Sequence, residues 1–220
     1  MKIAEIFYSI QGEGTLAGVP SVFVRTSGCN LRCAWCDTPY TSWSPEGQEM
    51  TVAEIAEQAR RYGARHAVVT GGEPMIAPAI EDLTRALGMH VTVETAGTVY
   101  KSVKCDLMSI SPKLANSTPS GTWTARHDRL RYQPEVLQRL ISEYEYQLKF
   151  VVSSPEDLGE IETVLRDTAA DRGRVLLMAE GKDAAVIRER ARWIAEIAKR
   201  EGFRYSPRLH IDLWGDRRGV

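Results

Sequence analysis

Short apolar segments alternate with longer amphipathic segments along this chain, and this alternation limits its possible folds more than any other feature. Pro20–Thr26 and Tyr146–Ser153 have the pattern of strands, whereas Thr51–Tyr62 and Asp183–Glu201 carry apolar residues at helical spacing. Strand and helix alternate about six times, which predicts βα units in a parallel sheet and therefore an α/β fold. A complete barrel would need about eight such units.

The remaining elements follow from the same two periodicities. Thr51 is expected to cap the start of its helix, and Gly63 to follow its end. Thr95–Cys105 and Lys113–Gln133 have no clear periodicity and are expected to be loops. Further strands are expected at Ile3–Ile10, Ala67–Thr70, Val91–Thr95, Asp106–Ser111, Arg174–Glu180 and around Arg208–Leu213, and further helices at Ala77–Leu87, Glu135–Tyr144 and Pro155–Asp167.

The composition is that of an ordinary globular protein. The 220 residues are 43% hydrophobic and 26% charged, and the net charge is −1. This length suits one domain spanning residues 1–220. The balanced charge predicts no broad attraction to nucleic acid or to an anionic membrane surface. No apolar run has the length of a membrane span, and no leader peptide is recognisable. Clustered cysteines fit the reducing cytoplasm.

Three of the four cysteines lie within eight residues, in the pattern C-x3-C-x2-C. Cys29, Cys33 and Cys36 can converge on one metal centre from a single loop. A cubane iron–sulfur cluster normally takes four cysteines, so three would leave one iron open to another molecule. Structural zinc would need a fourth ligand, a dithiol pair would leave Cys29 unexplained, and a disulfide framework does not suit so few cysteines.

Polar and glycine-rich motifs stand where predicted strands end. The turn Gln11–Gly14 follows the first strand, and the cysteine loop follows the second. Thr70–Pro74 (T-G-G-E-P) and Ser111–Lys113 (S-P-K) follow two later ones. Ligands of α/β folds bind at the carboxyl ends of the strands. Glycines such as Gly72 allow the backbone to approach a ligand closely. These motifs therefore predict a binding site at that edge of the sheet.

The cysteine signature followed by T-G-G-E-P resembles the radical S-adenosylmethionine superfamily. Together with Gln11–Gly14, Cys29–Tyr40 and Ser111–Lys113, it is similar to the 7-carboxy-7-deazaguanine synthase family. The resemblance runs from the first strand to the last few residues. It implies a single-domain open partial (β/α) barrel with some reduced helices. It also implies a lyase that contracts a pterin ring with loss of ammonia, in the biosynthesis of queuosine and other 7-deazapurines.

The resemblance implies three cofactors. Cys29, Cys33 and Cys36 would hold a 4Fe–4S cluster, its open iron would chelate S-adenosylmethionine, and Thr38 would bind Mg2+. The residues expected at the bound cofactors are Trp35, Asp37, Gly72, Glu73, Glu94, Ser111, Pro112, Lys113 and Lys149. For several of them a simpler role is open: Trp35 as an anchor of the loop, Asp37 as its cap and Glu73 as part of a structural turn.

The implied substrate is 6-carboxy-5,6,7,8-tetrahydropterin. The pterin presents adjacent N–H donors, which the carboxylate of Glu13 can accept in paired fashion. Arg25 can hold the substrate carboxylate by a two-pronged contact. In relatives the C-terminus can close over the substrate, although a frayed tail is the alternative here. The full set expected at the substrate is Ile10, Gln11, Gly12, Glu13, Arg25, Thr70 and Val220.

Two other functions remain open at this stage. One is a different small radical enzyme, such as a glycyl-radical activase, although that activity needs no pterin pocket. The other is a non-catalytic module stabilised by zinc. The expected partners are the small-molecule pterin, a flavodoxin-type reductant and a second copy of the chain in a homodimer.

Overall fold

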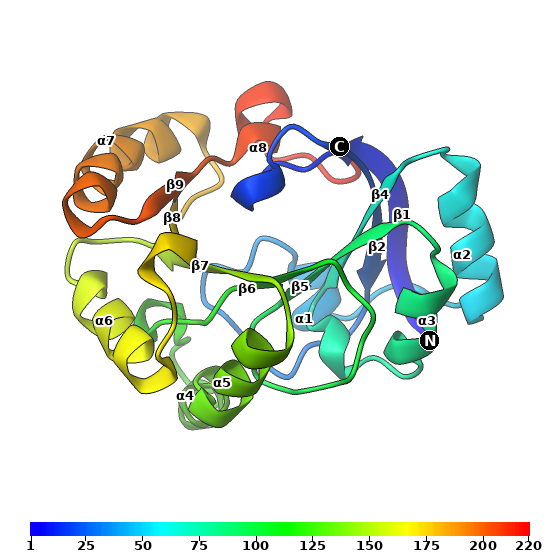
Figure 1. Cartoon of the computed structure of the whole chain (residues 1–220), viewed down its shortest axis with the longest axis horizontal. Helices are drawn as coiled ribbons and strands as arrows, with labels where there is room; N and C mark the ends of the chain where they lie inside the picture. Colours follow the sequence, from blue (N-terminus) through cyan, green and yellow to red (C-terminus); the bar gives the residue numbers. More distant parts are fainter.

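The computed structural model describes residues 1–220, and one curved sheet of nine strands runs through it (Figure 1). The strand order is β3-β1-β2-β4-β5-β6-β7-β8-β9. Neighbouring strands are parallel from β2 to β9, whereas β1 is antiparallel to both β2 and β3. The strands are β1 (Lys2–Ile10), β2 (Pro20–Thr26), β3 (Gln48–Glu49), β4 (His66–Gly71), β5 (His90–Thr95), β6 (Leu107–Ile110), β7 (Tyr146–Val152), β8 (Val175–Ala179) and β9 (Arg204–Ser206).

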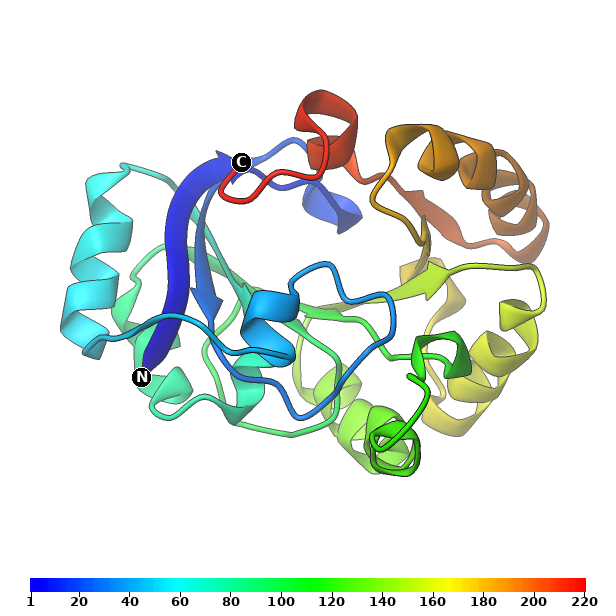
Figure 2. The same ribbon diagram turned by 180° about the vertical axis from the view of Figure 1, so that it is seen from behind.

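Most of the helices lie on the outer face of the sheet (Figures 1 and 2). None of them is both long and apolar enough to cross a membrane. They are α1 (Pro39–Ser42), α2 (Val52–Arg61), α3 (Ile80–Ala86), α4 (Thr124–Arg131), α5 (Pro134–Glu143), α6 (Asp157–Thr168), α7 (Ala184–Glu201) and α8 (Leu209–Trp214).

The pleat of the parallel strands separates an apolar core from a polar inner face. Val24, Val69, Val93 and Ile110 are fully buried and belong to one cluster of 35 buried apolar residues. That cluster also contains the buried faces of the outer helices, for example Leu83 of α3. The core therefore lies between the sheet and these helices, and the intervening strand residues face inward because side chains alternate along a strand.

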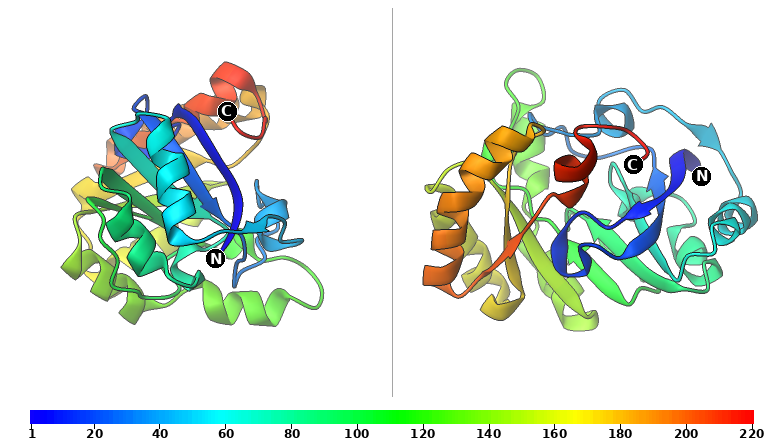
Figure 3. Two further views of the ribbon diagram at one scale, coloured as in Figure 1. Left: turned by 90° about the vertical axis from the view of Figure 1, so that its right-hand side faces the viewer. Right: turned by 90° about the horizontal axis from the view of Figure 1, so that it is seen from above.

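The barrel is open between β9 and the opposite edge of the sheet, which is formed by β3 and by the part of β1 beyond Ile3, and the C-terminal segment crosses this opening. Figure 3, seen from above, shows the last residues lying beside the first strand. The Leu209 N–H donates to the Gly12 carbonyl at 2.9 Å, and the Arg218 guanidinium reaches Glu5 in β1 at 3.3 Å. The expected open partial barrel is therefore confirmed, with its gap bridged by α8 and the tail.

The strand expected around Arg208–Leu213 is wrong. The last strand, β9, ends at Ser206, and the helix α8 follows after Pro207 and Arg208. The alternation of Leu209, Ile211 and Leu213 imitates a strand, but only Ile211 is buried, and Leu213 is 53% exposed.

The expected loop Lys113–Gln133 is also wrong in part, because it contains α4. This helix has no apolar stripe, and its one buried residue is His127. A helix that is polar on nearly every side gives no 3.6-residue signal to read. The expected loop after Thr95 is confirmed, since no helix or strand lies between Thr95 and Leu107.

The N-terminus of α2 has the predicted cap. The Thr51 hydroxyl accepts from the Glu54 N–H at 3.2 Å, and the Glu54 carboxylate accepts from the Thr51 N–H at 2.7 Å. Each side chain thus satisfies a backbone donor that the first turn of a helix leaves free.

The substitution Thr51→Ala is expected to lower the free energy of unfolding by about 1 kcal/mol, because the Glu54 N–H loses its acceptor. Thr51→Ser keeps the hydroxyl and serves as the control. Urea unfolding followed by circular dichroism measures both variants. An equal loss in the two would show that the hydroxyl does not cap the helix.

Candidate active site

A cavity of about 520 Å³ lies at the inner face of the sheet, near the carboxyl ends of its parallel strands. Such a volume is typical of small-molecule sites. Two residues predicted for the site, Glu73 and Pro112, do not line the cavity. The predicted residues that do line it are Ile10, Gln11, Gly12, Glu13, Arg25, Cys29, Cys33, Trp35, Cys36, Asp37, Thr38, Thr70, Gly72, Glu94, Ser111, Lys113, Lys149 and Val220.

The strand register brings polar residues from several strands onto the cavity wall. Arg25 of β2 is paired with Thr70 of β4, and Glu94 of β5 with Ser109 of β6. Lys149 of β7 lies on the same face, two residues beyond the Ser109 partner Gln147. Because these positions alternate with fully buried valines and isoleucines, the same pleat that builds the core builds the cavity wall.

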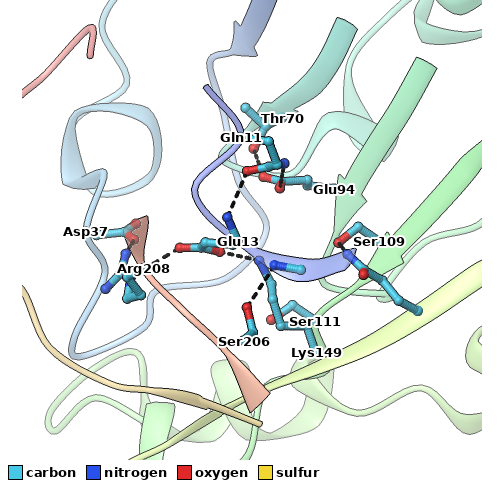
Figure 4. Close-up of polar contacts among 12 residues, drawn as sticks. Gln11, Glu13, Asp37, Thr70, Glu94, Ser109, Ser111, Lys149, Ser206 and Arg208 are labelled. Atoms are coloured by element: carbon cyan, nitrogen blue, oxygen red, sulfur yellow. Dashed lines mark hydrogen bonds and ion pairs between the residues drawn. The ribbon is translucent and has the colours of Figure 1, made fainter. Parts of the chain in front are cut away.

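Glu94 connects two residues that were predicted to contact the substrate (Figure 4). Its Oε2 accepts from Thr70 Oγ1 at 2.9 Å, and its Oε1 accepts from Gln11 Nε2 at 3.1 Å. Gln11 Oε1 in turn accepts from the Glu13 N–H at 3.2 Å. These bonds fix the Gln11 amide orientation, and they link β4 and β5 to the turn after β1.

Glu13 is held between two buried cations (Figure 4). One of its oxygens accepts from Lys149 Nζ, and the other accepts from Arg208 Nε at 3.1 Å. Arg208 also donates to Asp37 Oδ2 at 2.6 Å and to the Gly181 carbonyl. Arg208 therefore connects the turn after β1 to the cysteine loop.

This surrounding charge determines the ionisation of Glu13. Burial opposes the charged form, but Lys149 and Arg208 outweigh it and hold the pKa of Glu13 well below its usual range. Each carboxylate oxygen has a second lone pair beyond the one used by its cation. Glu13 is thus an ionised acceptor with a fixed carboxylate plane.

Arg25 belongs to a second ion-paired group that includes the C-terminal tail. Its Nε donates to Glu5 Oε1 at 2.7 Å, and the Tyr40 hydroxyl donates to the same oxygen at 2.6 Å. The Arg218 guanidinium lies 3.9 Å from the centre of the Tyr40 ring and also binds Glu5. Val220 lines the cavity, and these contacts of Arg218 place the tail beside the site.

The three clustered cysteines border the cavity in a form that suits a cluster. Burial raises the pKa of Cys29 to about 12 and that of Cys33 to about 11, so these thiols need a metal cation to become thiolates. No group of three or more His, Cys, Asp or Glu residues in the chain is arranged around a single ion. All three cysteines line the same cavity, and thiolates are the usual protein ligands of an iron–sulfur cluster.

The T-G-G-E-P turn supports the start of the cysteine loop. A Cβ on Gly72 would lie 2.2 Å from the Gly28 carbonyl oxygen and 2.8 Å from the Cβ of Cys29. The Glu73 N–H donates to that same Gly28 carbonyl at 2.9 Å. The Glu73 side chain is fully buried and accepts from Thr95 Oγ1 at 2.7 Å and from the N–H groups of Met75 and Ala96. These contacts agree with the simpler role of Glu73, as part of a structural turn.

The other side of the cysteine loop contacts the S-P-K motif. Lys113 Nζ donates to Ser111 Oγ at 2.8 Å and lies 5.8 Å from the centre of the Trp35 ring. The Trp35 Nε1–H donates to the Asn116 carbonyl at 3.0 Å. Thr38, at the start of α1, accepts from the Thr41 hydroxyl at 3.3 Å and lines the cavity.

Among the many cavity residues that were not predicted for the site are Lys182, Arg208 and His210. All three lie beyond the last motif of the site, and Arg208 and His210 were placed in the strand that does not exist. The ring of His210 packs against Gly12, where a Cβ would lie 2.0 Å from its Nδ1. Gly12 in the sequence therefore indicated that another group packs closely at this turn, but the sequence did not show that this group is His210.

Comparisons with known proteins agree with this geometry. The model of the Radical SAM superfamily matches residues 23–143. The 7-carboxy-7-deazaguanine synthase of Halobacterium salinarum is 47% identical over 234 residues, covering 98% of this chain and 91% of that protein. The same enzyme of Rhodopirellula baltica is 44% identical, covering 100% and 89%. The crystal structure of QueE from Escherichia coli aligns with a TM-score of 0.68 at 26% identity, covering 93% of this chain and 92% of that one.

The open barrel, the cysteine loop and the matched model define a radical S-adenosylmethionine enzyme. Within that superfamily the chain belongs to the 7-carboxy-7-deazaguanine synthase family, and it is a lyase of that kind. Its cofactors are accordingly a 4Fe–4S cluster, S-adenosylmethionine and Mg2+.

The substitution Gly72→Ala is expected to displace the backbone at Gly28 and Cys29, because its Cβ has no room there. The iron bound per chain after anaerobic reconstitution should fall by about half or more, as expected when the cluster loses one of its ligands. Gly159→Ala in α6 is the control, since nothing lies within 4 Å of its Cβ. Unchanged iron in Gly72→Ala would contradict the supporting role of this turn.

The substitution Glu13→Gln is expected to lower the free energy of unfolding at pH 7 by about 3 kcal/mol, because it leaves the buried Lys149 without an acid partner and Arg208 with Asp37 alone. The folded-state pKa of Glu13 is depressed, so its stabilisation exists above the unfolded pKa of about 4.3 and is lost as pH falls below it. The difference between wild type and variant should therefore shrink below about pH 4.

Urea unfolding at several pH values measures this difference. Glu57→Gln is the control, since its ion pair with Arg61 is exposed and should contribute less than about 1 kcal/mol. A Glu13→Gln effect that stays constant from pH 7 to pH 3 would show that the charge of Glu13 does not stabilise the fold.

Proposed function

We propose that this chain contracts the ring of 6-carboxy-5,6,7,8-tetrahydropterin to 7-carboxy-7-deazaguanine inside the cavity described above. The observation that carries the proposal is the convergence, on one cavity, of the cysteine loop and an ionised carboxylate beside a polar cluster. Neither alternative function needs this pair of features. An activase has no use for a pterin pocket, and a zinc module needs donors gathered at one ion.

Cys29, Cys33 and Cys36 are proposed to hold the cluster, with the open iron directed into the cavity. When bound, the cluster and S-adenosylmethionine supply the radical that takes a hydrogen atom from the pterin. Gly72, which presents backbone without a side chain beside Cys29, is proposed to lie against the amino group of the cofactor. The cofactor pocket is proposed to include Trp35, Asp37, Glu94, Ser111, Lys113 and Lys149. Pro112 lies outside the cavity wall and is proposed only to shape the turn between Ser111 and Lys113, and for Glu73 the buried contacts favour support of the turn.

Glu13 is proposed to accept the paired N–H donors of the pterin. Its remaining lone pairs support this role, since Lys149 and Arg208 occupy only one on each oxygen. Gln11 and Thr70, both bonded to Glu94, are proposed to contact the same ring. Ile10 and Gly12 complete that wall.

Arg25 is proposed to bind the carboxylate of the substrate. Glu5 occupies its Nε, and the outer guanidinium nitrogens have no acid partner. Such a fixed guanidinium can form two parallel bonds to a carboxylate. The tail that ends at Val220 is proposed to cover the substrate, supported by the contacts of Arg218 with Glu5 and Tyr40.

Thr38 is proposed to be the protein ligand of Mg2+. The position of Thr38 on the cavity wall, next to Asp37, supports this role. Magnesium retains much of its shell as water and substrate oxygens, so few protein ligands are required.

We also propose a reductant, an oligomeric state and a location for the enzyme. A flavodoxin-type protein is proposed to supply the electron that starts the reaction, and the chain is proposed to form a homodimer. Both rest on the family resemblance. The cytoplasm is the proposed location, supported by the four free cysteines. The continuous nine-stranded sheet supports a single domain over residues 1–220.

Anaerobic incubation of the reconstituted protein with S-adenosylmethionine, dithionite, Mg2+ and carboxytetrahydropterin tests the reaction. Mass spectrometry should detect 7-carboxy-7-deazaguanine, and Cys33→Ala should abolish it because the cluster loses a ligand. Cys105→Ala is the matched control, since Cys105 lies outside the loop and should not affect the product. Cleavage of the cofactor without this product would overturn the proposed substrate but not the radical chemistry.

A further inference from the structure

The cysteine loop is hydrogen-bonded to the segment Lys113–Gln133, which was expected to be a loop. Two backbone N–H groups flank Cys33, those of Arg32 and Ala34. The Arg32 N–H donates to the Nδ1 of His127 at 3.1 Å, and the Ala34 N–H donates to the Ser117 carbonyl at 2.8 Å. Both acceptors lie in the stretch between β6 and α5. The backbone on both sides of the middle cysteine is therefore bonded to one distant segment.

The bonds of His127 determine which of its nitrogens carries the proton. Because Nδ1 accepts from a backbone donor, the proton of the neutral ring must lie on Nε2. Nε2 is 3.0 Å from the Ser117 hydroxyl, which in turn donates to the Leu114 carbonyl at 2.6 Å. The donors and acceptors form one continuous chain from the cysteine loop to Leu114, and every polar atom in it is satisfied.

His127 is buried although it is polar, so its contact with the cysteine loop needs an explanation. It is the one buried residue of α4 and is fully inaccessible. It does not line the cavity, so contact with substrate or cofactor does not explain it. A second contact joins the same two segments, because the Arg32 guanidinium stacks on the Trp123 ring at 4.4 Å.

We propose that His127 is a positioning residue for the iron–sulfur cluster, and that its Nδ1 holds the backbone before Cys33 in the ligating conformation. This inference rests on the proposal that the three cysteines bind the cluster. The backbone N–H of Arg32 has no other acceptor, so loss of Nδ1 leaves a partly buried donor unsatisfied. The middle ligand then gains freedom, and the cluster dissociates faster.

Two substitutions separate this role from simple packing. Asn places its side-chain oxygen near the position of Nδ1 and keeps an acceptor for Arg32, whereas Gln reaches the position of Nε2 and contacts Ser117 instead. His127→Gln is expected to lose its cluster to a chelator about tenfold faster than wild type, the effect of one lost hydrogen bond. His127→Asn is expected to stay within about threefold of wild type.

Cluster loss is measured anaerobically by absorbance after addition of EDTA, beside the melting temperature of each apo variant. His66→Asn is the control: His66 is also buried, and its ring nitrogens contact Ser21 at 2.6 Å and Thr92 at 2.9 Å, away from the cysteine loop. This variant should lose stability without a faster loss of cluster. Equal rates in His127→Gln and His127→Asn, or a faster rate in His127→Asn, would overturn the inference.

A measurement on the wild-type apoprotein requires no variant to fold. Nitrogen-15 NMR of labelled histidine should find His127 protonated at Nε2 and bare at Nδ1, and a proton on Nδ1 would overturn the inference. If the wild type binds no iron, the proposed function fails. If it binds iron and His127→Gln retains it as well as wild type does, only the role of His127 fails.

Discussion

The parallel pairing of β2 with β4 is the constraint on which the rest of the site depends. Its register sets Arg25 beside Thr70 and Thr26 beside Gly71, so the strands end together. The cysteine loop and the T-G-G-E-P turn then leave the sheet as neighbours, and Gly72 fits against Gly28 only because it has no Cβ. If β2 shifted by one residue along β4, Arg25 would turn into the core and its buried neighbour Val24 into the cavity. Core and site are thus fixed by the same pairing.

Charge is the second organising feature. Glu13, Lys149 and Arg208 are removed from water in a site that must bind polar ligands, and such groups are tolerated when each is paired. The pairing also aligns them before a ligand arrives, which lowers the cost of ordering the site on binding. Arg208 spans the opening of the barrel and joins Asp37 in the cysteine loop to Glu13 in the turn after β1. The open edge is therefore closed by ion pairs in addition to backbone bonds.

Sequence reasoning predicted the sheet well because strand and helix periodicities are local. It found the cysteine loop and the strand-end motifs for the same reason, and it predicted the N-cap of α2 from Thr51. It failed where burial comes from a distant partner. The alternation of Leu209 and Ile211 imitates a strand, and α4 lacks an apolar stripe because it is held by a polar residue, His127. Arg208 was missed because nothing near it in the chain indicates that two distant carboxylates surround it.

The central claim is that three cysteines hold a cluster whose open iron faces the cavity. Electron paramagnetic resonance of the reduced, reconstituted protein tests it most directly, with S-adenosylmethionine carrying nitrogen-15 in its amino group. We expect the signal of a reduced 4Fe–4S cluster that changes when the cofactor is added and shows coupling to the labelled nitrogen. An iron signal that does not change when the cofactor is added, or a protein that retains zinc and no iron, would contradict this claim.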